Sequence, residues 1–262
     1  MPETKEQNTE AKPRDADQMG GFAKGLAVIE AFGQGRHALT IAEAARLAGL
    51  DRATTRRCLL TLVKAGYAGT DGRYFELTPR ILRLGHSYLA ASMPRLIQPS
   101  LDQLADKLHQ SCSASVLDGD EVVYIARATQ HRLMGVGLHP GSRLPAYCTS
   151  MGRVLLAALP PEQARTQMAS SERQKLTSRT LTDLDELMAE LDRVRTQGYA
   201  IIDQELELGS RSIAVPIRDL SRQTVAAFNV GAHAAHSTLE HLREAFLPHL
   251  LAAQAHLAEI LP

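Results

Sequence analysis

The chain has 262 residues, of which 44% are apolar, and its 29 basic and 29 acidic side chains cancel to a formal net charge of zero. The apolar fraction is large enough for a folded core and excludes a long disordered chain, while three widely spaced cysteines exclude a disulfide framework and favour a reduced, cytoplasmic protein. No apolar run approaches the roughly 18 residues that a membrane span needs, so no membrane partner is expected.

The first 20 residues are polar and contain two prolines. They lack the apolar segment of a secretory signal, and we expect a disordered tail over residues 1–20. After this tail, Phe22, Leu26 and Ile29 recur at helical spacing. This pattern predicts a first helix that buries these three side chains on one face.

Two further helices and a hairpin follow. Thr40 stands three residues before Glu43, which is the spacing of a capping box and predicts the start of a second helix. Asp51 is placed to cap a third helix. Asp71-Gly72 lies between two strand-like runs and predicts a two-residue hairpin turn. We therefore expect a helix-turn-helix with the hairpin as its wing, in a domain of residues 21–78.

The predicted third helix begins with a basic, polar sequence, RATTRR. The second helix of a helix-turn-helix presents its first residues to the major groove of DNA. Arginine binds guanine edges or phosphate, threonine can bind either, and an alanine methyl can touch a thymine methyl. The alternative is that these arginines form an ordinary solvated helix face. The residues expected to contact DNA are Thr40, Arg52, Ala53, Thr54, Arg56, Arg57 and, at the wing tip, Arg73.

The zero net charge conceals an uneven distribution along the chain. Residues 21–92 carry 10 basic and 5 acidic side chains, whereas residues 93–262 carry 16 basic and 19 acidic ones. Residues 1–20 carry 3 basic and 5 acidic side chains. Positive charge is therefore concentrated around the predicted helix-turn-helix, as binding to phosphates requires.

A change in sequence texture near residue 93 predicts a second domain. Thr78-Pro79 is a typical helix start, and we expect a linker helix over 79–92. Its apolar stripe could pack within one chain, but we favour pairing with the same helix of a second copy. Beyond it, helices alternate with antiparallel-looking strands, which predicts an α+β domain over 93–262. The predicted helices cover 94–110, 149–159, 161–168, 183–197 and 239–261, the last interrupted near Pro248, and the predicted strands cover 114–117, 121–127, 133–137, 199–203, 212–217 and 224–230.

Several segments together resemble one family of bacterial regulators. They are GFAKGLAVIEAF, the helix-turn-helix, GYAGTDGRYFELTPRILRLG, LPAYCTSMGRVLLA and GYAIIDQELELGSRSIAVPIRD. Over about residues 20–260 the chain is similar to the IclR family of transcription regulators. It looks most like the branch that controls aromatic-acid catabolism, which acts on protocatechuate, p-hydroxybenzoate or β-ketoadipate pathways.

The resemblance implies a winged helix-turn-helix domain, a linker helix and a C-terminal GAF- or profilin-like α/β domain that binds an effector. It further implies a homodimer or tetramer, palindromic double-stranded promoter DNA, and an aromatic or dicarboxylic acid as effector. Effector binding would change operator affinity or contact with RNA polymerase. We expect an activator. The alternatives are a repressor that responds to another small carboxylic acid, and a small-molecule sensor or enzyme that binds no DNA.

Position by position, the resemblance implies that Ser150, Met151, Asp203, Ser212 and Asn229 line the effector cavity. The residues themselves give partial support, since the start of a helix near Ser150 offers free N–H groups to a carboxylate. Asn229 interrupts an apolar run and needs a polar partner. We add four further candidates. Arg211 is a cation that could pair with the carboxylate of the effector. Met134, Leu144 and Tyr147 could form an apolar wall against its aromatic ring.

Each of these assignments has a structural alternative. Arg211 could pair with Glu205 or Glu207 instead of a ligand, and Tyr147 could hold a loop in place. Met151 and Asn229 could be ordinary core residues. Met151 also departs from the alanine or glycine that relatives often carry, which puts direct transfer of a small 2-oxoacid ligand in doubt.

No sequence motif indicates catalysis. The chain lacks GxSxG, P-loop and HExxH motifs. Cys148 is the one thiol in a plausible loop, but no histidine stands at a spacing that suggests a base. His233 and His236 are three residues apart, and no acid–histidine spacing indicates a metal. We therefore expect no enzyme activity, no catalytic residue, no metal and no cofactor.

Overall fold

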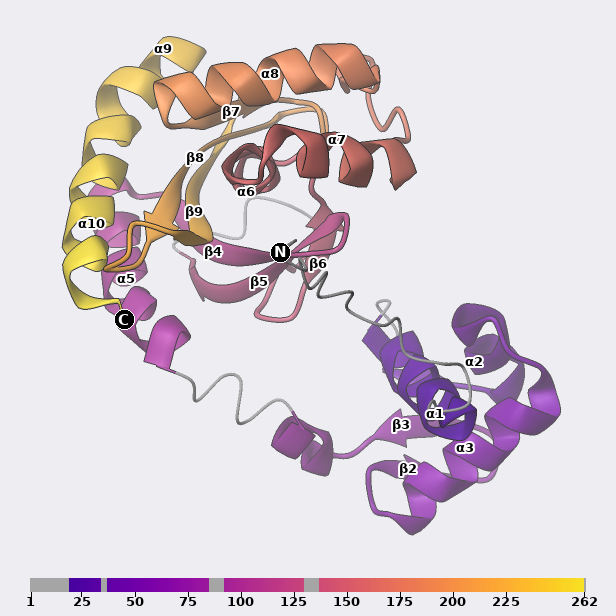
Figure 1. Ribbon diagram of the computed structural model, residues 1–262. Coiled ribbons are helices and arrows are strands. Elements are labelled where there is room, and N and C mark those ends of the chain that lie inside the picture. Colours follow the sequence, from indigo (N-terminus) through magenta and orange to yellow (C-terminus); the bar gives the residue numbers. More distant parts are fainter. Residues whose placement is uncertain (1–18, 34–36, 85–91, 130–136, 262) are drawn as a thin grey trace, which may run out of the picture. The chain divides into compact units, whose positions relative to one another are not determined.

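A computed structural model describes residues 19–33, 37–84, 92–129 and 137–261. The chain divides into two compact units, Met1–Ser87 and Tyr88–Pro262 (Figure 1). The predicted tail lies outside the described residues up to residue 18, and Gly20 already belongs to the first helix. In the described parts of the chain, no helix is long and apolar enough to cross a membrane.

The first unit is a winged helix-turn-helix. Three antiparallel strands form its sheet, in the order β1-β3-β2, and three α-helices pack beside them. The two-residue strand β1 was not predicted from the sequence. The elements are α1 (Gly20–Glu30), η2 (Ala31–Gly33), β1 (Ala38–Leu39), α2 (Ile41–Ala48), α3 (Arg52–Lys64), β2 (Ala68–Thr70) and β3 (Phe75–Leu77).

The core of this unit is built from side chains of all three helices and the sheet. Val28, Leu39 and Leu59 are completely buried. The prediction for α1 is wrong, because Phe22 is 66% exposed and Leu26 42% exposed. Periodicity located the helix, but Val28 is the residue that α1 places in the core.

The predicted linker helix is described only at its two ends. η3 (Pro79–Ile81) continues as helix to Leu84, and residues 85–91 lie outside the described part. At the far end, Ser92 is the first residue of α5. The two leucines between these ends that the structure describes, Leu82 and Leu84, are exposed.

The second unit has a six-stranded antiparallel sheet in the order β6-β5-β4-β9-β8-β7. Helices cover both of its faces, as expected for an α+β domain (Figure 1). The strands are β4 (Ser111–Asp118), β5 (Glu121–Ala128), β6 (Arg143–Pro145), β7 (Ala200–Asp203), β8 (Ser210–Arg218) and β9 (Thr224–His233). The helices are α5 (Ser92–Leu108), α6 (Ser150–Ala158), α7 (Pro161–Ser170), α8 (Leu184–Gln197), α9 (Leu239–His241), the π-helical η4 (Leu242–Phe246) and α10 (Leu247–Ile260).

The two faces of the sheet differ in character. One face packs large apolar side chains such as Ile213, Val215 and Phe228 against α5, η4 and α10. The other face packs on α6 and α8, and there β8 and β9 contribute the small Ala214 and Ala227. Small side chains let α6 pack close to this second face of the sheet.

Two strands of this unit differ from the sequence predictions. The predicted strand 133–137 falls almost wholly outside the described residues, and its last residue, Gly137, is not in a strand. β6 was not predicted from the sequence. The predicted interruption of the C-terminal helix near Pro248 is a π-helical turn, η4, which directly precedes that proline and accommodates its missing N–H.

Candidate DNA-binding and effector-binding sites

The start of α2 is fixed by the predicted capping box. The Thr40 hydroxyl accepts the Glu43 backbone N–H at 3.3 Å, and the Glu43 carboxylate accepts the Thr40 backbone N–H at 2.9 Å. The Thr40 hydroxyl also donates to that carboxylate at 2.8 Å. Gly49, with φ of 64°, ends the helix in the left-handed region that glycine tolerates. Local sequence therefore determines both ends of α2.

The predicted recognition helix α3 starts at the expected residue. The Asp51 carboxylate accepts the Thr54 backbone N–H at 2.8 Å, and this hydrogen bond holds the Asp51 pKa below its ordinary value. The outward placement of Thr54 is wrong. Its side chain is 9% exposed, and its hydroxyl accepts from Arg57 Nη2 at 3.2 Å. The side chains that α3 exposes along its first turns are Arg52, Ala53, Arg56 and Arg57.

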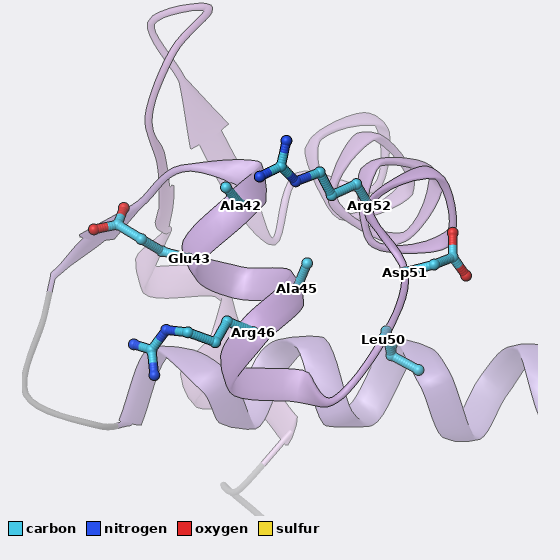
Figure 2. Close-up of a pocket in the computed structure, with 7 residues that line it drawn as sticks. All are labelled: Ala42, Glu43, Ala45, Arg46, Leu50, Asp51 and Arg52. Carbon is cyan, nitrogen blue, oxygen red and sulfur yellow. The ribbon is translucent and has the colours of Figure 1, made fainter.

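An open groove of about 520 Å³ lies where α2 turns into α3. Figure 2 shows Arg52 extending from α3 towards Ala42 on α2, whereas Asp51 points away. Ala42 and Ala45 line the groove with small side chains, and the exposed Arg46 lies on the α2 side. Arg46 was missed from the sequence, because its position on α2 does not show that it shares a groove with Arg52.

The wing is a longer loop than predicted. Four residues, 71–74, connect β2 and β3, so the two-residue turn is wrong. The Asp71 carboxylate accepts the backbone N–H groups of Tyr74 and Arg73 at 2.7 and 2.8 Å, and these bonds hold its pKa below the ordinary value. Arg73 is exposed at the tip, with its guanidinium 5.2 Å from the centre of the Tyr74 ring.

A row of polar side chains crosses the α6-facing side of the large sheet. Arg127 on β5 is opposite Ser113 on β4, and Ser113 is opposite Asn229 on β9. Directly opposed residues of antiparallel strands point to the same face. Arg127 Nη1 donates to the Ser113 hydroxyl at 2.9 Å. Asn229 is half-buried, and within the described residues its amide has no hydrogen-bond partner.

The start of α6 lies against this row. Thr149 caps the helix by accepting the Gly152 N–H at 3.2 Å. Ser150 is 1% exposed and shares a hydrogen bond of 2.8 Å with the Ser212 hydroxyl on β8. Met151 is also 1% exposed, and its sulfur accepts from Ser115 at 3.3 Å. The structure thus brings Ser150, Met151, Ser212 and Asn229, which the family resemblance groups together, to one side of the sheet.

The proposed ligand cation, Arg211, is already occupied. Its Nε lies 2.5 Å from Asp203, and its Nη1 donates to the carbonyls of Ala234 and Ser237 at 3.2 and 2.6 Å. The alternative partners Glu205 and Glu207 were also wrong. Asp203 pairs in addition with Arg179. Burial alone would raise the Asp203 pKa, but the hydrogen bonds from Arg211 and Gln204, together with the charges of Arg211 and Arg179, hold the pKa below its ordinary value. Both predicted residues are thus engaged with each other.

The three residues predicted for an apolar wall have separate outcomes. Tyr147 is 3% exposed, and its hydroxyl donates to the Gln174 carbonyl at 2.5 Å, which is the loop-holding role left open above. Leu144 lies on β6, opposite Val122, and packs at the margin of the α6-side core. Met134 lies outside the described residues.

Sequence reasoning missed a fully buried cation in α6. Arg153 is 3% exposed and donates to Glu205 at 2.7 Å and to the Tyr147 carbonyl at 3.0 Å. Glu190 on α8 lies 3.9 Å from the same guanidinium. This network ties α6 to α8 and to the loop after β7. An arginine in the apolar run MGRVLLAA was the available signal.

Neither thiol of the second unit is suited to nucleophilic chemistry. Burial raises the pKa of Cys112 and of Cys148 to about 12. Both therefore stay protonated at neutral pH, and a protonated thiol is a poor nucleophile. Among the residues with described positions, no three His, Cys, Asp or Glu side chains gather as a metal site requires.

A winged helix-turn-helix with an arginine-rich helix, followed by an α/β unit with a polar face under a helix, defines a ligand-responsive DNA-binding regulator. Residues 22–72 match the IclR helix-turn-helix domain, and residues 89–258 match the C-terminal domain of bacterial IclR transcriptional regulators. The chain belongs to the IclR family.

Relatives and solved structures agree with this assignment. The Pca regulon regulatory protein of Pseudomonas putida is 50% identical over 91% of this chain and 83% of its own. The p-hydroxybenzoate hydroxylase transcriptional activator of Acinetobacter baylyi is 40% identical over 82% of each chain. A transcriptional regulator from Rhodococcus sp. RHA1 superposes with a TM-score of 0.79, at 46% identity over 92% of this chain and 98% of that one.

Among the similar structures with a bound ligand is a double mutant of the PobR inducer-binding domain from Acinetobacter in complex with 3-hydroxybenzoic acid. This domain superposes with a TM-score of 0.61, at 33% identity over 64% of this chain and 98% of that one.

Proposed function

We propose that this protein regulates genes of aromatic-acid catabolism by binding promoter DNA as a cytoplasmic homodimer or tetramer. The observation that carries the DNA-binding part is the row of exposed arginines on the capped helix α3, inside a unit that matches the IclR helix-turn-helix domain. In this proposal Arg52, Ala53, Arg56 and Arg57 enter the major groove, and Arg73 of the wing contacts the DNA backbone or the minor groove.

Thr40 and Thr54 have supporting parts in this proposal. The Thr40 hydroxyl is committed to the capping box, so it positions α2 instead of reading a base. Thr54 accepts a hydrogen bond from Arg57 and so restrains that guanidinium. Arg46 and Arg52 line the groove between α2 and α3 and could contact a phosphate, although Glu43 and Asp51 line it as well.

The effector in this proposal is a small aromatic acid. Support comes from the acid bound to the similar inducer-binding domain and from the polar row beneath α6 in this chain. Ser150, Ser212 and Asn229 would provide its hydrogen bonds, and Met151 would form part of the apolar wall. Asp203 and Arg211 would shape the margin of the site as an ion pair.

We assign the role of activator, with the acid altering operator binding and contact with RNA polymerase. The 40% identity to a protein named as a transcriptional activator supports this sign. Ligand control requires that the acid bind one arrangement of the dimer better than the other. The exposed Leu82 and Leu84 after η3 are consistent with a linker that pairs with its copy.

A DNA-binding titration tests the proposal. The promoter fragment upstream of the protein's own gene would be labelled, and binding would be followed by fluorescence anisotropy. Arg57→Ala should weaken binding by about tenfold or more, because a base or phosphate contact of arginine contributes about 1–3 kcal/mol. Lys175→Ala is a matched control, since it removes the same charge from an exposed position in the other unit.

Two results would contradict the proposal. The first is equal affinity of the wild type for the promoter fragment and for a scrambled fragment of the same length. The second is an equal loss for Arg57→Ala and Lys175→Ala, which would make the effect one of net charge alone. Circular dichroism of both variants would establish that each is folded.

A further inference from the structure

Arg127 differs from Arg153 and Arg211, two other buried or half-buried arginines of this unit. Arg153 has Glu205 as a partner, and Arg211 has Asp203. The Arg127 guanidinium has only neutral partners among the described residues, donating from Nε to the Thr129 hydroxyl at 3.0 Å and from Nη1 to Ser113 at 2.9 Å. Two hydroxyls do not use all five N–H groups of a guanidinium.

The surroundings of Arg127 disfavour an uncompensated charge. Burial lowers the pKa of its guanidinium, yet an arginine remains protonated at any physiological pH. A cation removed from water without a counterion destabilises a folded protein. An anion that bound to the Arg127 guanidinium would therefore stabilise the folded protein.

A second polar group near Arg127 also has no partner. Tyr124 is 5% exposed, and within the described residues its hydroxyl makes no hydrogen bond. Burial raises its pKa to about 12 and the charge of Arg127 opposes that rise, so at neutral pH the phenol is a donor. Among the described residues this phenol is therefore available to donate a hydrogen bond to a ligand.

A β-bulge places these two groups on the same face. Tyr124 and Arg127 are three residues apart and would point to opposite faces of a regular strand. The register shifts between Ala114 and Ser115, so Tyr124 is opposite Ser115 while Arg127 is opposite Ser113. Ser113 and Ser115 are two apart on β4 and share the α6-facing side. Bulges often re-aim a side chain in this way beside binding sites.

We propose that Arg127 binds the carboxylate of the aromatic-acid effector, with Tyr124 as a second donor. This assignment rests on the proposed function and specifies how its ligand is held. It differs from the sequence expectation, in which Arg211 or the start of α6 bound the carboxylate. Arg211 is occupied by Asp203, and the first turn of α6 is buried under its own cap.

The spacing of the strands sets the size of the ligand. The guanidinium reaches Ser113, so it lies over β4, and the Ser150–Ser212 hydroxyl pair belongs to α6 and β8. β4 and β8 are separated by β9, which makes two interstrand steps, or roughly 10 Å. One benzene ring with hydrogen bonds at both ends fits that distance. The carboxylate would meet Arg127, and a ring hydroxyl would meet Ser150, Ser212 or Asn229.

Isothermal titration calorimetry of the full chain tests this assignment. The probes are 4-hydroxybenzoate, protocatechuate and the neutral isostere 4-hydroxybenzamide. The variants are Arg127→Gln and the control Arg218→Gln, which changes an exposed arginine at the end of β8. Arg127→Gln should weaken binding of the better acid by at least about 30-fold, since a charge-assisted hydrogen bond to a buried carboxylate is lost. Arg218→Gln should bind as wild type does.

The amide separates recognition of charge from a general effect on the fold. Wild type should prefer the acid over the amide, and Arg127→Gln should bind the two with affinities within about threefold of each other. Equal weakening of acid and amide in Arg127→Gln, or unchanged acid binding, would overturn the assignment. If neither acid binds wild type, the proposed effector class itself is wrong. In that case the promoter titration of wild type shows whether the DNA-binding part still holds.

Discussion

Gly152 is the third residue of α6, where the helix packs against the backbone of the loop before it. A Cβ at this position would lie 2.2 Å from the Ala146 carbonyl oxygen and 2.4 Å from the Ala146 Cα. Because both are backbone atoms, neither can rotate away. Gly152→Ala can be accommodated only if the start of α6 and residues 146–149 move apart.

Two opposing effects decide the outcome of Gly152→Ala. Alanine is favoured over glycine inside a helix by about 1 kcal/mol. An extra methyl in a packed interior costs about 1–3 kcal/mol, and more where the backbone must move. A separation of 2.2 Å belongs to the second case, so the clash should prevail. We expect a net loss of about 2 kcal/mol or more, together with weaker acid binding, because Ser150 and Met151 shift with the helix.

Urea unfolding of the full chain, followed by circular dichroism, measures this effect. Gly231→Ala is the matched control, because its Cβ would meet the Ser111 carbonyl oxygen at 3.8 Å, an ordinary contact. The control should unfold at nearly the wild-type urea concentration. A Gly152→Ala midpoint equal to or above that of wild type would refute the close approach of α6 to the loop.

Two further substitutions test separate parts of the structure. Thr40→Ala removes the cap of α2, so it should lower the stability of the first unit by about 1 kcal/mol and weaken promoter binding. The affinity for the acid, measured by calorimetry, should be unchanged. Unchanged thermal unfolding would show that the capping box contributes nothing. Glu205→Gln leaves the buried Arg153 without its nearest carboxylate and should cost about 3 kcal/mol or more in urea unfolding. The exposed pair Arg165–Asp185 provides the contrast, since Asp185→Asn should cost well under about 1 kcal/mol, and equal losses for the two would contradict the role of burial.

Features that depend on neighbouring residues could be predicted from the sequence. Thr40 and Glu43 interact across one helical turn, and Asp51 caps the helix that begins beside it. Gly198 directly follows the helix predicted over 183–197, and it ends α8 with φ of 81°. In each case the residues that fix the helix boundary are close together in the sequence, so the boundary follows from local chemistry.

Features that depend on register or on distant segments could not be predicted. The periodicity of α1 located a helix but not the side that the sheet and α3 cover, so Phe22 was assigned to the core in error. The sequence suggested Glu205 or Glu207 as the partner of Arg211, because both are close to it along the chain. The β7–β8 pairing instead places Asp203 directly opposite Arg211.

The polar row beneath α6 could likewise be predicted only in part, because it depends on strand register. Asn229, Ser150 and Ser212 were found through family resemblance. Arg127 and Tyr124 were missed, because only the bulge in the β4–β5 pairing brings them to one face. The alternating serines of SCSAS were a signal for a polar face, but they did not show which cation would lie opposite.

The central claim is that acid binding in the second unit controls DNA binding by the first. It is tested by measuring the promoter dissociation constant with and without saturating 4-hydroxybenzoate or protocatechuate, and the acid dissociation constant with and without promoter DNA. We predict that one acid changes promoter affinity by about 5- to 150-fold and that DNA changes the affinity of that acid by the same factor, since coupling is reciprocal. If an acid binds the protein but leaves promoter affinity unchanged, and DNA leaves the affinity for that acid unchanged, acid binding does not control DNA binding.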